Sequence, residues 1–180
     1  MHPSDADLVR RVREGGADSV AVLVEPYYRP CLRFALRMLG DRADAEEATQ
    51  DAFVRAYRSL DRYEDRNRFG AWLFQILVNQ CRSVLRRQRT RERLFVPYDF
   101  AAELVGSEEP EDRHWSAAVQ RALLQLAPPL REALLLRCVE EQSYEEIAKA
   151  TGAGVSAVKM RVKRARDRMR ELLQESHSVG

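Results

Sequence analysis

Hydrophobic residues recur at spacings of three and four along most of the chain, which is the pattern of helices that bury one face. The apolar–polar alternation of strands is rare, and glycine and proline are sparse. The predicted helices span residues 5–14, 18–39, 44–60, 69–89, 115–126 and 129–140, with two more beginning at Ser143 and at Val155. The sequence therefore predicts an all-α fold.

Helical periodicity fails in residues 90–113. This segment contains two prolines and a glycine, and its later part is acidic. Such a composition is typical of a flexible linker. We therefore expect two small helical domains, residues 1–89 and 114–180, which the acidic linker leaves free to move relative to one another.

A capped helix and a glycine turn precede the most basic part of the chain. Ser143 and Glu146 have the spacing of a capping box, and Gly152 can adopt the positive φ that ends a helix. The helix from Val155 has one apolar stripe, formed by Val155, Val158, Val162, Ala165, Met169 and Leu172. Two helices joined by a short turn, the second strongly basic, predict a helix-turn-helix whose second helix enters the major groove of DNA.

The polar face of that second helix carries candidate DNA contacts. Early-turn side chains that share the groove face are candidate base readers: Ser156, Lys159, Met160 and Lys163. Arginines beside them are better placed for phosphates: Arg161, Arg164, Arg166 and Arg168. A basic amphipathic helix also suits a membrane surface or a partner's groove, but the capped helix and glycine turn favour DNA.

The helix predicted over residues 69–89 has a second polar face. Four side chains at spacings of four, three and four form it: Gln75, Asn79, Arg82 and Arg86. Amides suit base edges and guanidiniums suit phosphates. Tyr63 precedes them in a charged loop, and an aromatic ring beside basic groups is typical of a single-strand binding site. In the alternative interpretation there is no binding site: Phe69 and Trp72, at helical spacing, belong to a core, and Asn79 is a solvated amide.

Composition narrows the class of protein. The net charge is only +2, so the basic character is local. Cys31, Cys81 and Cys138 lack metal-ligand spacing and are expected to be reduced core thiols. We expect no catalytic site, metal or cofactor, because the candidate residues never cluster. Without a membrane-spanning run or a signal peptide, the sequence predicts a cytoplasmic protein with no membrane insertion.

Three stretches, in this order, carry a family resemblance: DAEEATQDAFVRAY (residues 44–57), RFGAWLFQILVNQCRSVLRR (residues 68–87) and residues 126–169 around the helix-turn-helix. Together they resemble the bacterial extracytoplasmic-function sigma factors, the small two-domain sigma subunits of RNA polymerase. The resemblance covers residues 7–173 except for the linker. It implies that the first domain is sigma region 2, which binds core polymerase and opens the minus 10 element, and the second is sigma region 4, which reads the minus 35 element.

The resemblance also implies roles for individual residues. It implies that exposed groups of one helix bind polymerase: Asp44, Glu47, Gln50, Asp51 and Arg55. In the alternative interpretation, the acids near the start of that helix are explained by its dipole alone. Tyr63 and Asn79 fall where an extruded base of the minus 10 element is captured, and the other implied minus 10 contacts are Trp72, Gln75, Arg82 and Arg86. The implied minus 35 contacts are Ser156, Lys159, Met160, Arg161, Lys163 and Arg164. Gly70 and Ala71 are smaller than the family usually has there.

The implied partners are core RNA polymerase, promoter DNA as duplex and as melted non-template strand, and an anti-sigma protein. The chain itself is expected not to be an enzyme. Two other functions are open: a stand-alone, dimeric helix-turn-helix repressor or activator, and a helical adaptor whose basic helix grips an acidic partner protein.

Overall fold

The computed structural model describes residues 5–14, 17–64, 69–94 and 117–178, and within these ranges every regular element is a helix. The first part of the chain forms α1 (Asp5–Arg13), α2 (Ala17–Leu39), α3 (Arg42–Ser59), the short 3-10 helix η1 (Leu60–Arg62) and α4 (Phe69–Leu94). The second part forms α5 (Ala117–Gln125), α6 (Pro128–Cys138), α7 (Tyr144–Thr151) and α8 (Val155–Ser178). The all-α prediction is confirmed.

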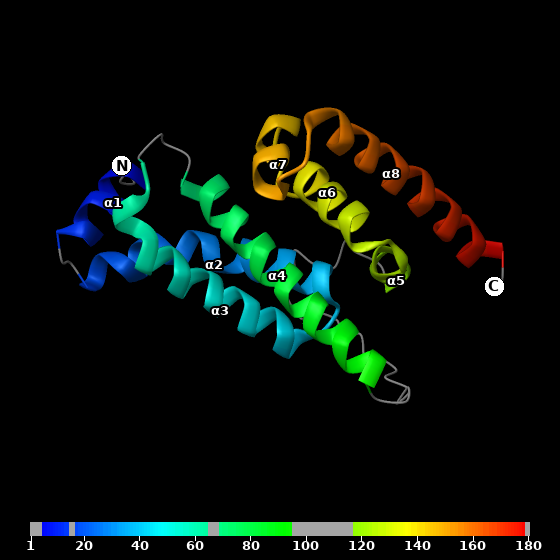
Figure 1. Cartoon of the computed structure of the whole chain (residues 1–180), viewed down its shortest axis with the longest axis horizontal. Coiled ribbons are helices and arrows are strands. Elements are labelled where there is room, and N and C mark those ends of the chain that lie inside the picture. Colours follow the sequence, from blue (N-terminus) through cyan, green and yellow to red (C-terminus); the bar gives the residue numbers. More distant parts are fainter. Residues whose placement is uncertain (1–4, 15–16, 65–68, 95–116, 179–180) are drawn as a thin grey trace.

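In the first domain, α2, α3 and α4 pack against one another, and α1 packs on α2 and η1 (Figure 1). Asp41 begins α3 by accepting a hydrogen bond from the backbone amide of Asp44 at 2.8 Å. The buried face of α3 consists mainly of alanines at positions 45, 48, 52 and 56. Side chains this small let neighbouring helices approach closely, so α3 can contact both α2 and α4.

The second domain is the predicted helix-turn-helix with two supporting helices. Ser143 and Glu146 form the capping box of α7, and Gly152 follows it with φ of 67°. α8 then begins at Val155, with Val158, Val162 and Ala165 of its stripe buried against the other helices of the domain. The predicted capping box and glycine turn are confirmed.

α4 is longer than predicted and continues to Leu94 instead of ending at Arg89. Residues 90–94, expected in the linker, therefore extend the helix, because they include no proline or glycine to end it. The remainder of the predicted linker lies outside the described residues.

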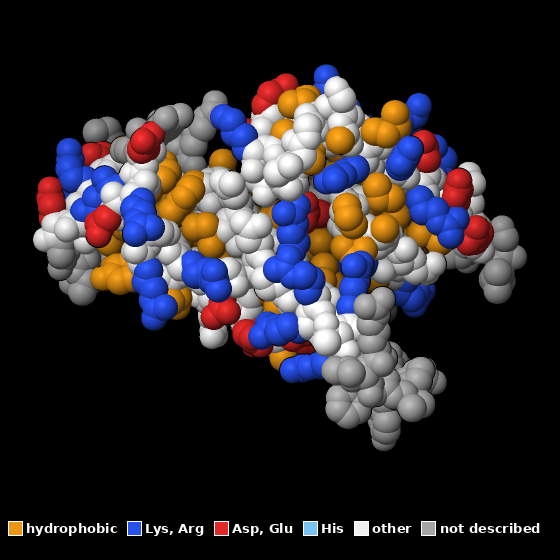
Figure 2. Space-filling view, viewed as in Figure 1, with side chains coloured by type: hydrophobic (Ala, Val, Ile, Leu, Met, Phe, Trp, Pro, Cys, Tyr) orange, Lys and Arg blue, Asp and Glu red, His pale blue; other side chains and the backbone are white. Residues whose placement is uncertain are grey.

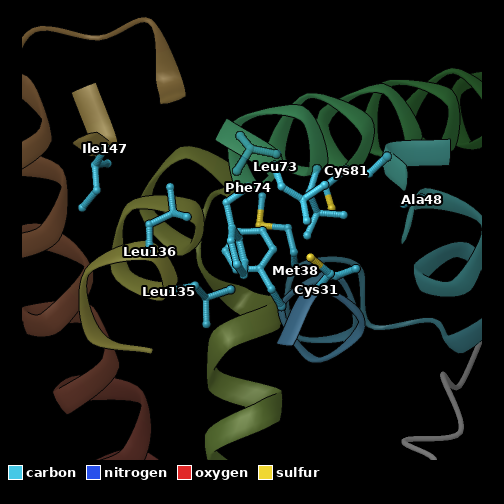
Figure 3. Close-up of a cluster of buried hydrophobic side chains, with 14 of the residues drawn as sticks. Cys31, Met38, Ala48, Leu73, Phe74, Cys81, Leu135, Leu136 and Ile147 are labelled. Carbon is cyan, nitrogen blue, oxygen red and sulfur yellow. The ribbon is translucent and has the colours of Figure 1, made fainter. Parts of the chain in front are cut away.

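The two domains are packed against each other in the structure, which the sequence did not indicate. α7 contacts α4, while α5 and α6 contact α2. Their apolar side chains belong to one cluster, in which Phe74 and Met38 of the first domain lie near Leu135 of the second (Figure 3). Sequence periodicity shows which face of a helix is apolar, but it does not show that apolar residues of two domains meet.

The two domains also meet at the end of α2. Gly40 has φ of 77°, which favours glycine, and a Cβ built on it would lie 2.8 Å from the end of the Leu124 side chain of α5, so a larger residue would be strained and would displace that side chain. Arg131 of α6 donates hydrogen bonds to the carbonyl oxygens of Leu123, Leu124 and Leu126 and to that of Met38 in the first domain. One buried guanidinium thus joins the end of α5 to the end of α2.

Candidate nucleic-acid interface

The four polar residues predicted on α4, Gln75, Asn79, Arg82 and Arg86, lie along one face of that helix, and we call them the polar ribbon. Asn79 and Arg86 are exposed, whereas Gln75 and Arg82 are half-buried. In the space-filling view, Lys and Arg side chains gather over α4 at the boundary with the second domain (Figure 2). The ribbon is therefore basic but only partly open to solvent.

The second domain supplies the acceptors that cover Gln75 and Arg82. The Gln75 amide donates to the backbone carbonyl of Lys149 at 3.2 Å. Arg82 donates from Nε and Nη2 to the two carboxylate oxygens of Glu132, at 2.8 and 2.7 Å, and from Nη2 to the carbonyl of Thr151 at 3.1 Å. Half of the ribbon is thus engaged by α6 and by the end of α7.

Sequence reasoning missed Glu132 and Arg131. A signal was present: α6 reads PPLREALLLRC, so Arg131 and Glu132 stand among apolar residues on every side of the helix, with Arg137 the only other charge and near its end. A helix apolar on all sides is a buried helix, and charges on a buried helix need partners. Both residues are indeed buried, and Glu132 is only 2% exposed.

Burial controls the electrostatics of Glu132. It raises the pKa of this carboxyl above its ordinary value, and the hydrogen bonds and charge of Arg82, with the charge of Arg161, act in the opposite direction. The charged form therefore depends on Arg82 for compensation. Without that partner the buried carboxylate would keep only the charge of Arg161 to offset its lost hydration.

Tyr63 is not presented on a loop surface, and this expectation is wrong. Its side chain is only 7% exposed, and its ring lies 4.9 Å from that of Trp72 and 5.8 Å from that of Phe69, between centroids. Arg13 holds the adjacent backbone by donating to the carbonyls of Leu60 and Tyr63. The ring is buried because it completes an aromatic cluster at the start of α4; residues 65–68 of the loop lie outside the described residues.

A cleft of about 340 Å³ opens beside this aromatic cluster. The first domain lines it with Tyr63, Trp72 and Gln75, among others, and the second with Glu146 and Lys149. Gly70 follows Phe69 of this cluster, and a Cβ added to it would lie 2.9 Å from the Tyr27 ring. The small residue at position 70 is therefore explained by the close approach of Tyr27.

A second interdomain cleft, of about 280 Å³, is strongly basic. Its charged lining consists of Arg82, Arg86, Arg89 and Arg161 against the single acid Glu132. Arg161 is half-buried there, so it is less open to solvent than the other predicted phosphate contacts of the recognition helix, and its contact with a phosphate stays a prediction. The reason is that α8 begins beside α6, and the Arg161 side chain faces the boundary with the first domain.

The recognition face of α8, formed by Ser156, Lys159, Met160, Lys163 and Arg164, is open. All five are exposed. Lys159 Nζ also lies 5.6 Å from the ring centroid of Tyr144. Of the other predicted phosphate contacts, Arg166 lies 3.6 Å from the Cys138 sulfur and Arg168 pairs with Glu171 at 2.9 Å.

The candidate polymerase surface on α3 is exposed at Glu47, Gln50, Asp51 and Arg55. Asp44 differs from expectation, because it is half-buried and accepts a hydrogen bond from the Gln88 amide at 2.6 Å. Glu47 pairs with Arg87 at 2.9 Å, but both side chains remain about half exposed. Exposed pairs of this kind contribute little to stability, so Glu47 stays available to a partner.

Cys31 and Cys81 are buried free thiols, as expected, and burial raises the pKa of both, that of Cys81 to about 12. Cys138 is exposed, so its assignment to the core is wrong; it stands at the end of α6, where the helix leaves the interior. Among the described residues, no three His, Cys, Asp or Glu side chains group as metal ligands. None of the described helices has the length and apolar character needed to cross a membrane.

Known proteins match both domains. Residues 23–91 match the family described as Sigma-70 region 2, and residues 116–169 match Sigma-70, region 4. The ECF RNA polymerase sigma factor SigW of Bacillus subtilis is 28% identical, over 93% of this chain and 95% of that protein. The RNA polymerase sigma factor CarQ of Myxococcus xanthus is 34% identical, over 93% of this chain and 96% of its own.

Solved structures agree over nearly the whole chain. CnrH, solved in complex with the cytosolic domain of CnrY, superposes with a TM-score of 0.70 at 29% identity, covering 96% of this chain and 99% of that one. The sigma factor RpoE of Bartonella quintana, solved with the anti-sigma factor NepR, gives 0.67 at 27% identity, covering 84% and 94%. This chain therefore belongs to the sigma-70 family, as an extracytoplasmic-function sigma factor with regions 2 and 4.

Proposed function

We propose that this sigma factor initiates transcription by dividing promoter recognition between its two domains. The first, residues 1–89, uses α3 to bind core RNA polymerase and α4 to hold the melted minus 10 strand. The second, residues 114–180, uses α8 to read the minus 35 duplex. The observation that carries this proposal is that one chain holds both an amide–arginine ribbon beside an aromatic cluster and an open basic recognition helix.

The chemistry of the two faces fits the two forms of DNA. Asn79 and Gln75 can bond the edges of unstacked bases, Arg82 and Arg86 can bind phosphates, and Trp72 offers a ring against which a base can stack. On α8, Lys159 and Lys163 can reach base edges in the major groove, while Arg164 contacts the backbone. Opening costs a few kcal/mol for each unstacked base, which contacts with the ribbon and with polymerase offset.

The partners follow from this division. Core polymerase carries out RNA synthesis, so the chain contributes binding and no catalytic step, and it works in the cytoplasm where polymerase and promoters lie. Two solved relatives are bound to NepR, an anti-sigma factor, and to the cytosolic domain of CnrY. By analogy, we include an anti-sigma protein among the partners of this chain.

Fluorescence anisotropy of promoter duplex, with and without core polymerase, tests this function against its rivals. Promoter fragments are first selected by transcription of a genomic library with the reconstituted holoenzyme. We expect weak, salt-sensitive binding by the chain alone, of about micromolar affinity, and specific binding about a thousandfold tighter with polymerase. Tight specific binding by the chain alone, as a dimer, would indicate a repressor. Specific binding in neither case would indicate an adaptor.

A further inference from the structure

We propose that the free chain masks its own strand-binding site: Glu132 and the last carbonyl groups of α7 occupy the donors of Arg82 and Gln75 that would hold DNA. Single-stranded DNA then gains the full ribbon only after the second domain has moved away. The inference rests on the proposed function, because it assumes that the ribbon binds a melted strand.

The Arg82–Glu132 contact reproduces the way an arginine holds a phosphate. Nε and Nη2 each donate to a separate carboxylate oxygen, at 2.8 and 2.7 Å. Arginine uses the same two-donor edge for a phosphate group. A DNA phosphate and the Glu132 carboxylate therefore cannot both occupy this edge of Arg82.

The end of α7 supplies two further acceptors. Lys149 and Thr151 belong to the last turn of the helix, whose carbonyls lack partners within the helix and carry its negative partial charge. Their oxygens accept from Gln75 at 3.2 Å and from Arg82 at 3.1 Å. Carboxylate and carbonyl oxygens together stand in for the acceptors of a nucleic-acid strand.

Interdomain contacts away from the ribbon also hold the second domain against the first. Arg131 bonds the carbonyl of Met38, Leu124 packs on Gly40, and Phe74 and Leu135 share one apolar cluster (Figure 3). The ion pair also contributes, because removing the Glu132 charge alone would leave the half-buried Arg82 guanidinium without its carboxylate. The closed arrangement is therefore held by several contacts, and the charged one discriminates between carboxylate and phosphate.

Other functional surfaces remain accessible in the closed chain. The recognition face of α8 is exposed, as are most of the candidate polymerase contacts on α3. α4 contacts both α3 and α7 and lies between them (Figure 1). Polymerase can therefore dock on α3 while α7 still covers the ribbon, and separation of the domains then follows docking.

The test uses the full chain with Trp115→Phe, which leaves Trp72 as the single tryptophan of the two in the sequence. Trp72 lines the interdomain cleft, so its emission reports opening. Glu132→Gln removes the charge that competes with phosphate. Glu145→Gln is the matched control, because it makes the same charge change at an exposed site of α7.

In Glu132→Gln we expect a red-shifted Trp72 emission and a larger hydrodynamic radius. Anisotropy of a fluorescein-labelled, mixed-sequence single-stranded DNA should show about tenfold tighter binding, the gain expected when the competent state rises from about a tenth to most of the population. The Glu145→Gln control should match the parent. Equal radius, emission and affinity in all three proteins would overturn the proposal.

Leu124→Glu opens the interface at its other end without altering the ribbon or the recognition helix, and it should produce the same three changes. Helical circular dichroism confirms folding of each variant; if Glu132→Gln fails to fold, Leu124→Glu decides the question by itself. The proposed function is tested separately, by transcription of a premelted promoter with wild-type holoenzyme. Failure there rejects the promoter role, whereas normal transcription with no opening in the variants rejects only the masking.

Discussion

The polar ribbon of α4 and the recognition face of α8 are both polar helix faces with basic groups, yet they differ in what lies opposite them. The recognition face, from Ser156 to Arg164, meets solvent. In the ribbon, Gln75 and Arg82 meet the second domain, while Asn79 and Arg86 stay exposed. A polar helix face thus shows only that a surface is not packed into its own domain; another domain can still satisfy its hydrogen bonds.

The two faces also differ in the free energy that must be spent before DNA can bind. Duplex binding by α8 requires no rearrangement of this chain, whereas strand binding by α4 must first replace the bonds to Glu132, Lys149 and Thr151. A site whose competent form is rarely populated binds more weakly in proportion. The two faces should therefore respond differently to mutation and to polymerase.

The largest effect is expected from Arg131→Met, which removes the guanidinium shared by both domains. Burial lowers the pKa of Arg131 to about 10, so the side chain is still charged at neutral pH. Its loss leaves buried carbonyls of α5 and α2 without a donor and should lower the free energy of unfolding by about 3 kcal/mol. Urea denaturation followed by circular dichroism measures this. Exposed Arg121→Met is the control, and equal losses in the two variants would contradict the role of Arg131.

The variants Lys159→Ala and Arg164→Ala test the recognition face of α8. Lys159 shares the groove face, so its loss should reduce discrimination between matched and mutated minus 35 sequences by about 1 to 3 kcal/mol. Arg164→Ala should weaken all duplexes alike and reduce the salt slope by about one. Competition binding with holoenzyme gives both numbers. A Lys159→Ala loss that is the same on every duplex would remove this residue from the base readers.

The exposed part of the ribbon is examined with Asn79→Ala. Loss of one hydrogen bond to an extruded base should slow promoter opening by a factor corresponding to about 1 kcal/mol. Closed-complex affinity and fold should be unchanged, because the Asn79 side chain is exposed. Permanganate reactivity of minus 10 thymines reports opening. If the variant opens linear promoter DNA at the wild-type rate, Asn79 is a surface amide and not part of the base pocket.

The smallest effect concerns pH and Glu140, which follows α6 and whose carboxyl interacts with the charges of Arg33 and Arg37 in the first domain. Burial raises the pKa of Glu140 from 4.5 to about 7, although both arginines act in the opposite direction. Because the pKa is raised in the folded protein, the associated stability is present below about pH 4.5 and is lost as pH rises through 7.

Relative to Glu140→Gln, the wild type should lose about 1 kcal/mol or less between pH 5 and pH 8, once screening by solvent is allowed for. Urea midpoints of the two proteins across this range measure the difference. Parallel pH curves would show that Glu140 does not titrate within the interface.

Local structure was accessible from the sequence because its causes are local. The Ser143–Glu146 capping box, the turn at Gly152 and the stripe from Val155 depend on residues within a few positions of one another. The same holds for the ribbon, since spacings of four, three and four place its members on one side of any helix. Family membership followed from these motifs in order, and the matches to sigma-70 regions 2 and 4 confirmed it.

What the sequence by itself determined, then, is the set of helices, their apolar faces and the motifs they carry. Only the tertiary structure decided that Tyr63 is buried against Trp72, that Arg161 faces a cleft, and that Glu132 binds Arg82 across 50 positions of the chain. Such contacts depend on how whole faces of helices fit together. Spacing along the chain cannot encode that fit, because a buried charge selects its partner by geometry in three dimensions and by the high cost of remaining alone.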